Sequence, residues 1–209
     1  MFAELLAHPG VVEEVDLRSK VGVMAFHGGS LERGTDAIAR AVADRSGASL
    51  YVVVQPDDLR WHVPSKLFDP AASQRLTTFL AHVDVAIAVH GYGRAGWFTT
   101  VLAGGTNRRL AAAIAAAATP ALDLPDTRYD VVDDLDLIPV ELRGQHPDNP
   151  VNLPRHGGVQ LELPPRIRGR GPHWDDAGPG PCPHTEALVD ALASVVSGAP
   201  ADRWETADP

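Results

Sequence analysis

Apolar residues along the chain form runs of strand length that alternate with stretches of helical periodicity. One apolar run covers residues 21–27 and another covers 49–55. Between them the apolar positions recur at helical spacing, with Thr35 placed to cap a helix and Gly47 placed to end it. The order strand, helix, strand is typical of a βαβ unit, whose parallel strands are joined by a right-handed crossover. The pattern therefore predicts a largely parallel sheet.

The remainder of the chain continues this alternation. Further apolar or alternating segments predict strands, and capping and periodicity signals predict helices. The expected strands are 84–90, 97–103 and 157–163, and the expected helices run through Leu6, from Asp69 to about His82, after Asn107 and from Thr185 to Ser197. We therefore expect an α/β fold, a single three-layer domain with a mixed, largely parallel sheet flanked by helices.

The size and composition of the chain fit one ordinary globular domain. It has 209 residues, of which 44% are hydrophobic and 22% charged, and this usage favours an ordered core over disorder. We expect residues 1–209 to form one unit without repeats. Within it, 1–19 is read as an N-terminal extension, 169–183 as a Gly- and Pro-rich loop over the site, and 199–209 as a frayed tail.

Two of the expected strands end in a histidine that is followed by glycine. The run 21–27 ends at His27, Glu32 lies in the turn that follows, and the run 84–90 ends at His90. Ligand sites of open α/β sheets gather at the carboxyl ends of the strands, so both histidines point to one edge. Catalytic zinc uses three such imidazole or carboxylate ligands and keeps one position open. The arrangement favours a zinc site formed by these three residues.

Two other interpretations of these residues stay open. A single histidine near a strand end is more often a hydrogen-bonded structural residue than a ligand. A glycine-rich turn between strand and helix can also bind phosphate at the helix N-terminus. The glycines after His27 match neither the P-loop pattern, because no lysine follows Gly34, nor the dinucleotide-binding pattern. Nucleotide binding therefore ranks below metal binding.

Charge and cysteine content exclude several classes of protein. The formal net charge is -9 and the chain has no lysine-rich tract, which argues against nucleic-acid binding. The single cysteine, Cys182, excludes an internal disulfide and a four-cysteine zinc site. No secretory signal pattern opens the sequence, and no apolar run has the length of a membrane span. We expect a cytoplasmic protein, and no sequence feature indicates its oligomeric state.

Four motifs follow one another along the chain in an order known from one family. They are His27-Gly-Gly-x-Leu-Glu32-x-Gly-Thr35, a strand that ends in His90-Gly91, the pair Gly104-Gly105, and Gly158-Val-Gln-Leu-Glu162-Leu. From about Val21 to Arg168 the chain resembles the poly-γ-glutamate hydrolase family, first known from bacteriophages. That family is a compact relative of the zinc carboxypeptidases, so the resemblance implies a zinc-carboxypeptidase-like fold.

The resemblance also implies roles for particular residues. It implies one zinc per chain, held by His27, Glu32 and His90, and it adds Glu162 as the catalytic carboxylate. Such a carboxylate takes a proton from a metal-activated water as general base and returns it to the leaving amine as general acid. The implied reaction is amide hydrolysis without a covalent intermediate.

A substrate that carries a carboxylate needs a cationic or polar partner in the pocket. Arginine suits this purpose because its planar guanidinium pairs with two oxygens at once. The candidates are Arg155 with Asn152, Arg108 in the first turn of its helix, and Tyr92 after the second histidine-ended strand. In this chain two residues separate Asn152 from Arg155, whereas the family has an asparagine and arginine pair before its last motif.

The leading hypothesis is a zinc-dependent amidase or peptidase that cleaves γ-glutamyl or related carboxylate-bearing amide bonds. Its substrate would be a small molecule or an oligopeptide, with neither nucleic acid nor membrane as partner. The alternative is a non-catalytic metal- or ligand-binding protein on the same scaffold. An esterase-like or phosphate-handling enzyme is disfavoured because the sequence lacks a G-x-S-x-G elbow and a P-loop.

Overall fold

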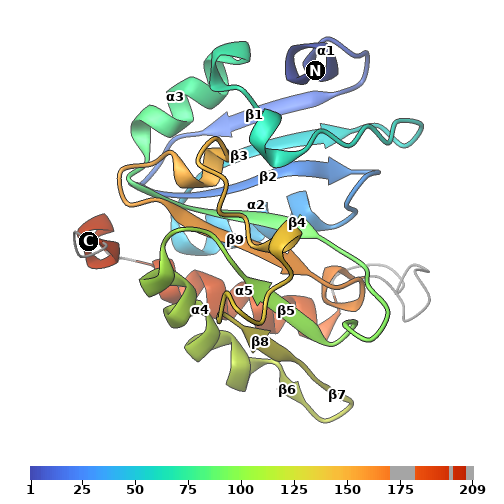
Figure 1. Cartoon of the computed structure of the whole chain (residues 1–209), viewed down its shortest axis with the longest axis vertical. Coiled ribbons are helices and arrows are strands. Elements are labelled where there is room, and N and C mark those ends of the chain that lie inside the picture. The colour runs from blue at the N-terminus through green and yellow to red at the C-terminus, as the bar shows by residue number, and fades with distance from the viewer. Residues whose placement is uncertain (170–181, 198–199, 206–209) are drawn as a thin grey trace.

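A computed structural model of the protein describes residues 1–169, 182–197 and 200–205. Strands and helices alternate from residue 21 to residue 91, and pairs or runs of strands precede and follow that part of the chain (Figure 1). The helices are α1 (Phe2–Leu6), α2 (Thr35–Ser46), α3 (Gln74–His82), α4 (Arg108–Ala121) and α5 (Pro183–Val196). The strands are β1 (Val12–Asp16), β2 (Val21–Gly29), β3 (Ser49–Gln55), β4 (Val85–Gly91), β5 (Thr100–Ala103), β6 (Asp123–Leu124), β7 (Thr127–Arg128), β8 (Asp130–Val132) and β9 (Gly158–Leu163).

Short 3-10 helices connect these elements. They are η1 (Ser65–Leu67), η2 (Pro70–Ala72), η3 (Val140–Leu142), η4 (Pro150–Asn152), η5 (Arg166–Arg168) and η6 (Ala201–Trp204). Two of them, η1 and η3, border the candidate site described below.

The described residues form one main sheet of seven strands in the order β1-β3-β2-β4-β9-β5-β8 (Figure 1). The pairs β2–β3, β2–β4, β4–β9 and β5–β8 are parallel. The pairs β1–β3 and β5–β9 are antiparallel. The prediction of a mixed, largely parallel sheet in a single α/β domain is confirmed.

Helices cover both faces of the sheet, which gives the expected three layers. The apolar sides of α2, α4 and α5 pack against one face, and α1 and α3 pack against the other (Figure 1). Successive residues of β2 alternate between these two cores, with Val23 and Ala25 on the α2 side and Met24 and Phe26 on the α3 side. This alternation explains why the central strands are continuously apolar.

The helix expected from Asp69 to about His82 is divided in two. Residues Pro70–Ala72 form η2, and α3 starts only at Gln74. Ser73 between them is extended, and its hydroxyl accepts a hydrogen bond from the backbone N–H of Leu76 at 3.0 Å. Ser73 therefore acts as the N-cap of α3, while Asp69, whose side chain accepts from the N–H of Ala71, caps η2.

Both ends of the chain take part in the fold, and the helix expected through Leu6 is confirmed. The expected extension 1–19 contains α1, whose Phe2 and Leu5 are buried, and the edge strand β1. Within the segment expected to be a frayed tail, η6 forms and buries Trp204, whose carbonyl oxygen accepts a hydrogen bond from Asn107 at 2.8 Å. Most of the expected loop 169–183 lies outside the described residues.

Two further features bear on function. Residues 91–96 read G-x-G-x-x-G after β4, but the chain continues through turns to β5, so the helix that a dinucleotide site requires does not follow. Among the described residues, no helix combines the length and the apolar character needed to cross a bilayer.

Candidate functional site

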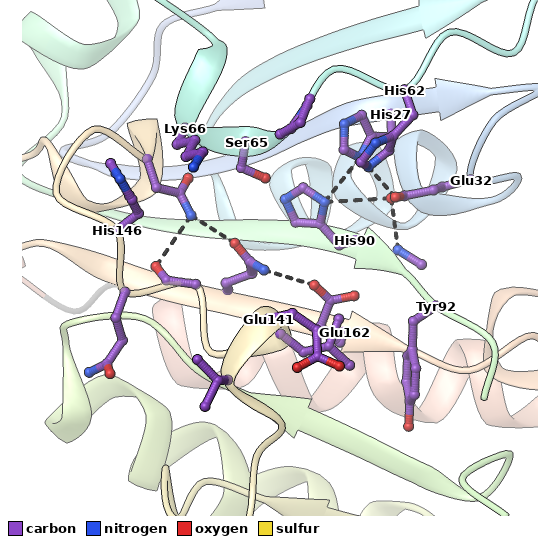
Figure 2. A pocket seen from close by; sticks show the side chains of 18 residues that line it. His27, Glu32, His62, Ser65, Lys66, His90, Tyr92, Glu141, His146 and Glu162 are labelled. Carbon is purple, nitrogen blue, oxygen red and sulfur yellow. Dashed lines mark hydrogen bonds and ion pairs between the residues drawn. The ribbon is translucent and has the colours of Figure 1, made fainter. Parts of the chain in front are cut away.

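Three neighbouring parallel strands each carry a polar side chain near the carboxyl end. His27 lies on β2, His90 on β4 and Glu162 on β9. His90 and Glu162 are register partners across β4 and β9. The pairing of β2 with β3 shifts register between Ala25 and Gly28, a local irregularity at His27. Figure 2 shows the three side chains at one pocket, at the carboxyl ends of β2, β4 and β9, where the sequence pattern placed the two histidines.

A tight turn after β2 brings Glu32 back to the same place. The backbone N–H of Glu32 donates to the carbonyl oxygen of His27 at 2.8 Å. Gly29 enters the turn with φ of 72° and passes so close to β3 that a Cβ there would lie 2.1 Å from the carbonyl oxygen of Gln55. Only glycine fits this conformation and this approach without strain, which gives the His-Gly-Gly motif its physical reason.

The three residues predicted as metal ligands contact one another. His27 Nδ1 lies 2.8 Å from Glu32 Oε1, and His90 Nδ1 lies 3.2 Å from His27 Nδ1 and 3.5 Å from Glu32 Oε2 (Figure 2). Both histidines are buried and Glu32 is largely so. His90 Nε2 has no hydrogen-bond partner among the described residues, so the ring is oriented through Nδ1. A compact group of two imidazoles and one carboxylate results.

Backbone groups outside the cluster hold two of these side chains. His27 Nε2 lies 2.8 Å from the carbonyl oxygen of Val63, which can only accept, so Nε2 carries the hydrogen. The lone pair of Nδ1 in the neutral ring then faces the carboxylate of Glu32. The N–H of Gly91 donates to Glu32 Oε2 at 2.8 Å. Such contacts orient metal ligands in known sites.

The carboxylate of Glu32 and the two imidazole rings need a positive charge among them. Burial alone raises the pKa of Glu32, but the attraction of His27 and His90 outweighs burial and holds the pKa well below its ordinary value. Burial likewise lowers the pKa of His27, while the charge of Glu32 raises it more. A lone pair on Nδ1 opposite a carboxylate requires positive charge between the two, either a proton or a metal ion.

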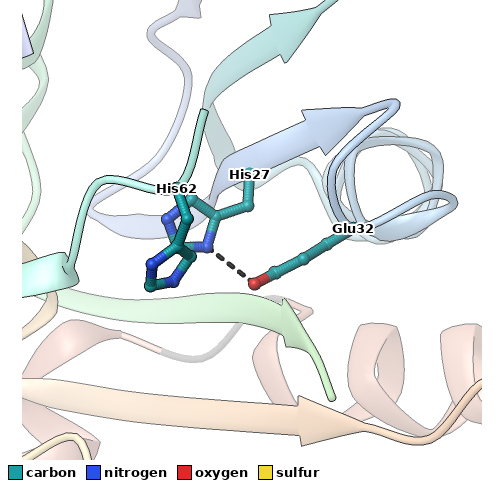
Figure 3. A group of neighbouring side chains, drawn as sticks. All are labelled: His27, Glu32 and His62. Carbon is teal, nitrogen blue, oxygen red and sulfur yellow. Dashed lines mark hydrogen bonds and ion pairs between the residues drawn. The ribbon is translucent and has the colours of Figure 1, made fainter. Parts of the chain in front are cut away.

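A third histidine lies beside this group. His62 is exposed in the connection between β3 and η1, and its ring centroid lies 4.8 Å from that of His27. One ligand atom from each of His27, Glu32 and His62 falls within 4.8 Å of the others (Figure 3). His62 belongs to none of the four motifs quoted from the sequence. The shorter distances and the burial favour His90 over His62 as the third ligand.

Glu162 lies buried next to the cluster and is held by a pair of amide side chains. Gln160 Nε2 donates to Glu162 Oε1 at 2.7 Å, and Asn149 Nδ2 donates to Gln160 Oε1 at 2.8 Å. Burial raises the pKa of Glu162 to about 7. Gln160 and Glu162 share one face of β9 because side chains alternate along a strand, as the sequence pattern indicated.

These residues line a pocket of about 530 Å³. Besides the strand residues, its walls include Ser65 and Lys66 of η1 and a segment that runs from Val140 to Asn149 (Figure 2). No role for this segment was predicted, because a loop without periodic apolar positions carries no signal of what it covers. Lys66, Glu141 and Gln145 are therefore site residues that sequence reasoning missed.

The structure does not bring three of the four candidate substrate-binding residues to this pocket. Arg108 donates to the carbonyl oxygens of Ala103 and Gly105 at 3.0 and 3.2 Å, which turns its guanidinium toward the backbone before α4. Asn152 donates to the carbonyl oxygens of Gly144 and His146. These two side chains satisfy backbone groups of nearby loops.

Arg155 is exposed and does not line the pocket. Tyr92 does line it with its ring, but its hydroxyl lies 2.7 Å from the carbonyl oxygen of Thr100 and 2.9 Å from that of Trp97 (Figure 2). The aromatic side chain of Tyr92 therefore forms part of the pocket wall, while its hydroxyl hydrogen-bonds to the backbone.

Comparison with known sequences relates the chain to one family. The sequence profile of the family described as poly-gamma-glutamate hydrolase matches residues 2–170. The SPbeta prophage-derived protein YoqZ of Bacillus subtilis (strain 168) is 34% identical over 107 residues, which cover 51% of this chain and 37% of that protein. The chain thus matches little more than a third of the length of that relative.

Two solved structures share the fold over most of their length. The structure of a bacteriophage poly-gamma-glutamate hydrolase superposes with a TM-score of 0.70 at 23% identity, covering 89% of this chain and 87% of that one. A structure described as zinc-free apo YndL superposes with a TM-score of 0.72 at 20% identity, covering 90% and 89%.

Proposed function

The chain belongs to the poly-γ-glutamate hydrolase family, and from this we propose that it is a zinc-dependent hydrolase of γ-glutamyl or related carboxylate-bearing amide bonds. One observation carries the proposal. The atoms His27 Nδ1, Glu32 Oε1 and His90 Nδ1 meet in one pocket beside the buried carboxyl group of Glu162. This combination supplies a metal-ligand set and a general base within a single site.

The ligand set suits zinc. Tetrahedral zinc with bonds of about 2.0–2.2 Å keeps its ligand atoms roughly 3.3–3.5 Å apart. The 3.2 Å between the two Nδ1 atoms agrees with this, and the 2.8 Å from His27 Nδ1 to Glu32 Oε1 needs only a small opening. The second carboxylate oxygen, Oε2, lies 3.5 Å from His90 Nδ1, so Glu32 faces both rings. Three protein ligands leave one position for water, which is the composition of a catalytic zinc site. Zinc bound there supplies a water of lowered pKa and polarises the scissile carbonyl group.

Glu162 is suited to move the protons of this reaction. A pKa of about 7 lets its carboxyl group accept a proton at neutral pH and give it up again. Gln160 occupies Oε1 as a donor at 2.7 Å, which fixes the plane of the carboxylate and leaves Oε2 for a water proton. Glu162 would then return this proton to the departing amine, so no covalent intermediate is needed.

The proposal is tested by hydrolysis of γ-linked glutamate oligomers, with α-linked oligomers as comparison, by protein purified with zinc. We expect new amino groups to appear only from the γ-linked substrate. Glu162→Gln should retain zinc and lose at least about 100-fold in turnover, the contribution of a general base. Undiminished turnover in Glu162→Gln would exclude the proposed base. Zinc binding without hydrolysis of any amide would favour a non-catalytic binding protein.

A further inference from the structure

The described residues that line the pocket include one lysine and no arginine. The lysine is Lys66, which is exposed on η1 between β3 and α3. Among the described residues no hydrogen-bond or ion-pair partner is found for its ammonium group. Arg94, by contrast, pairs with Glu141 at the pocket rim. Lys66 is therefore a cation whose charge is available to a ligand.

His146 provides a hydrogen-bond donor on the same side of the pocket. In Figure 2, Lys66 and His146 both lie on the side opposite Glu32. The N–H of Asp148 donates to His146 Nδ1 at 3.2 Å, so a neutral His146 carries its hydrogen on Nε2. Asn152 steadies this segment because its amide donates to the carbonyl oxygens of Gly144 and His146 at 2.7 and 3.0 Å.

The charges around the pocket leave few places for a second carboxylate. Glu32, Glu141 and Glu162 line its other parts, and the whole chain carries a net charge of -9. Salt screens the distant charges over about 8–10 Å, so the nearest groups decide where an anion binds. Other lining groups, among them Ser65, Gln145 and Asn149, are uncharged. The carboxylate of Asp148, which does not line the pocket, lies 3.8 Å from His146 Nδ1, on the side of that ring away from its Nε2 donor. An anionic group is best accommodated at this end.

We propose that Lys66 binds a carboxylate of the substrate, with Nε2 of His146 as a neighbouring donor. This inference rests on the proposed hydrolysis of carboxylate-bearing amides and names the side chain that recognises a free carboxylate away from the scissile bond. A γ-linked glutamate chain has this chemistry, because each residue keeps its α-carboxylate. Lys66 thereby takes the role for which the sequence suggested Arg155 and Arg108.

The test uses two substrates that differ only in that group. One is a γ-linked glutamate trimer with free α-carboxylates, and the other is the same trimer with α-carboxamides. Lys66→Met should lower kcat/KM about fivefold for the acid, the upper range for an exposed ion pair, and leave the amide form unchanged. Lys66→Arg should keep the preference for the acid. His146→Phe should weaken the same preference by a smaller factor.

The chain offers a matched control. Lys20 is its other lysine, and its ammonium group donates to the carbonyl oxygen of His82 at 2.7 Å, away from the pocket. Lys20→Met changes the net charge equally and should leave both substrates unaffected. Equal losses on both substrates in Lys66→Met, or no loss on either, would overturn the assignment.

Binding separates this inference from the proposed function. Calorimetry with the acid trimer and zinc-loaded Glu162→Gln protein should show a Kd about fivefold higher when Lys66→Met is added. If the wild type hydrolyses neither trimer, the hydrolase proposal fails, and the calorimetry still decides the role of Lys66. An unchanged Kd would refute that role.

Discussion

The two walls of the pocket differ in origin and in packing. The inner wall consists of His27, His90, Gln160 and Glu162, which lie on β2, β4 and β9 and are buried. The outer wall consists of His62, Lys66, Glu141 and His146, which lie on connecting segments and are exposed. The inner residues contact one another or neighbouring polar groups at 2.7–3.5 Å, whereas Lys66 has no such contact among the described residues.

The buried strand residues of the inner wall are suited to catalysis, and the exposed loop residues of the outer wall are suited to substrate recognition. Groups that hold a metal or transfer a proton need positions fixed to a fraction of an ångström, and rigid strands provide them. Groups that recognise a substrate must first be reached by it, and loops at the surface allow this. Substitutions in the inner wall should therefore abolish function, and those in the outer wall should change preference.

The largest expected effect separates His90 from His62. His27→Ala and His90→Ala should each raise the Kd for zinc by more than about 100-fold, because even the loss of an outer hydrogen-bond partner costs 10–100-fold. His62→Ala should keep about one zinc per chain. Metal analysis after dialysis, with circular dichroism to verify folding, provides the measurement. Equal loss of zinc in His62→Ala and His90→Ala would move His62 into the ligand set.

Two glycines with nearly the same positive φ test how closely β2 and β3 pack behind the inner wall. Gly29 has φ of 72° and Gly47 has φ of 73°, but a Cβ at Gly47 meets nothing within 4 Å. Gly47→Ala should cost about 1 kcal/mol for the left-handed conformation alone. Gly29→Ala should cost about 3 kcal/mol or more, because its Cβ also overlaps Gln55. Urea unfolding measures both, and similar values would contradict the close approach.

The burial of Glu162 predicts a pH dependence of stability in the metal-free protein. Its pKa is raised from an ordinary 4.5 to about 7, so between these values the folded state binds more protons than the unfolded state. The free energy of unfolding should therefore fall as pH rises through this window, by on the order of 3 kcal/mol.

Glu162→Gln isolates this contribution, because the substituted amide does not titrate while all other groups remain. Urea unfolding at pH 5 and pH 8 with a metal chelator present should show a smaller loss of stability in Glu162→Gln than in the wild type. The same loss in both proteins would mean that Glu162 is not held in an apolar environment.

The smallest of these effects concerns the amide that holds the base. Gln160→Leu removes the 2.7 Å donor to Glu162 and should lower kcat about tenfold with little change in KM, since a hydrogen bond to a charged group contributes about 1.5–3 kcal/mol. Gln145→Leu is the matched control, because Gln145 also lines the pocket but is exposed. A comparable fall in kcat for Gln145→Leu would deny Gln160 a specific positioning role.

The sequence pattern alone predicted the mixed, largely parallel sheet and the two histidines of the inner wall, whereas Glu162 came from the family resemblance. Apolar runs that end in His27-Gly and His90-Gly place both histidines at one sheet edge, because parallel strands end on the same side. The alternation in 158–163 places Gln160 and Glu162 on one face, because the side-chain period of a strand is two. These inferences depend on local periodicity and on one rule of sheet topology, and both can be read from neighbouring residues.

Only the tertiary structure decided which residues form the outer wall and whether the candidate arginines reach the pocket. Lys66 and His146 are 80 positions apart in the sequence numbering, and no local pattern relates them. Arg108 and Asn152 satisfy backbone carbonyls instead of facing the pocket, and Trp204 turns part of an expected tail into core. The direction of a side chain in a loop depends on which distant backbone groups need a partner, and that becomes fixed only when the chain folds.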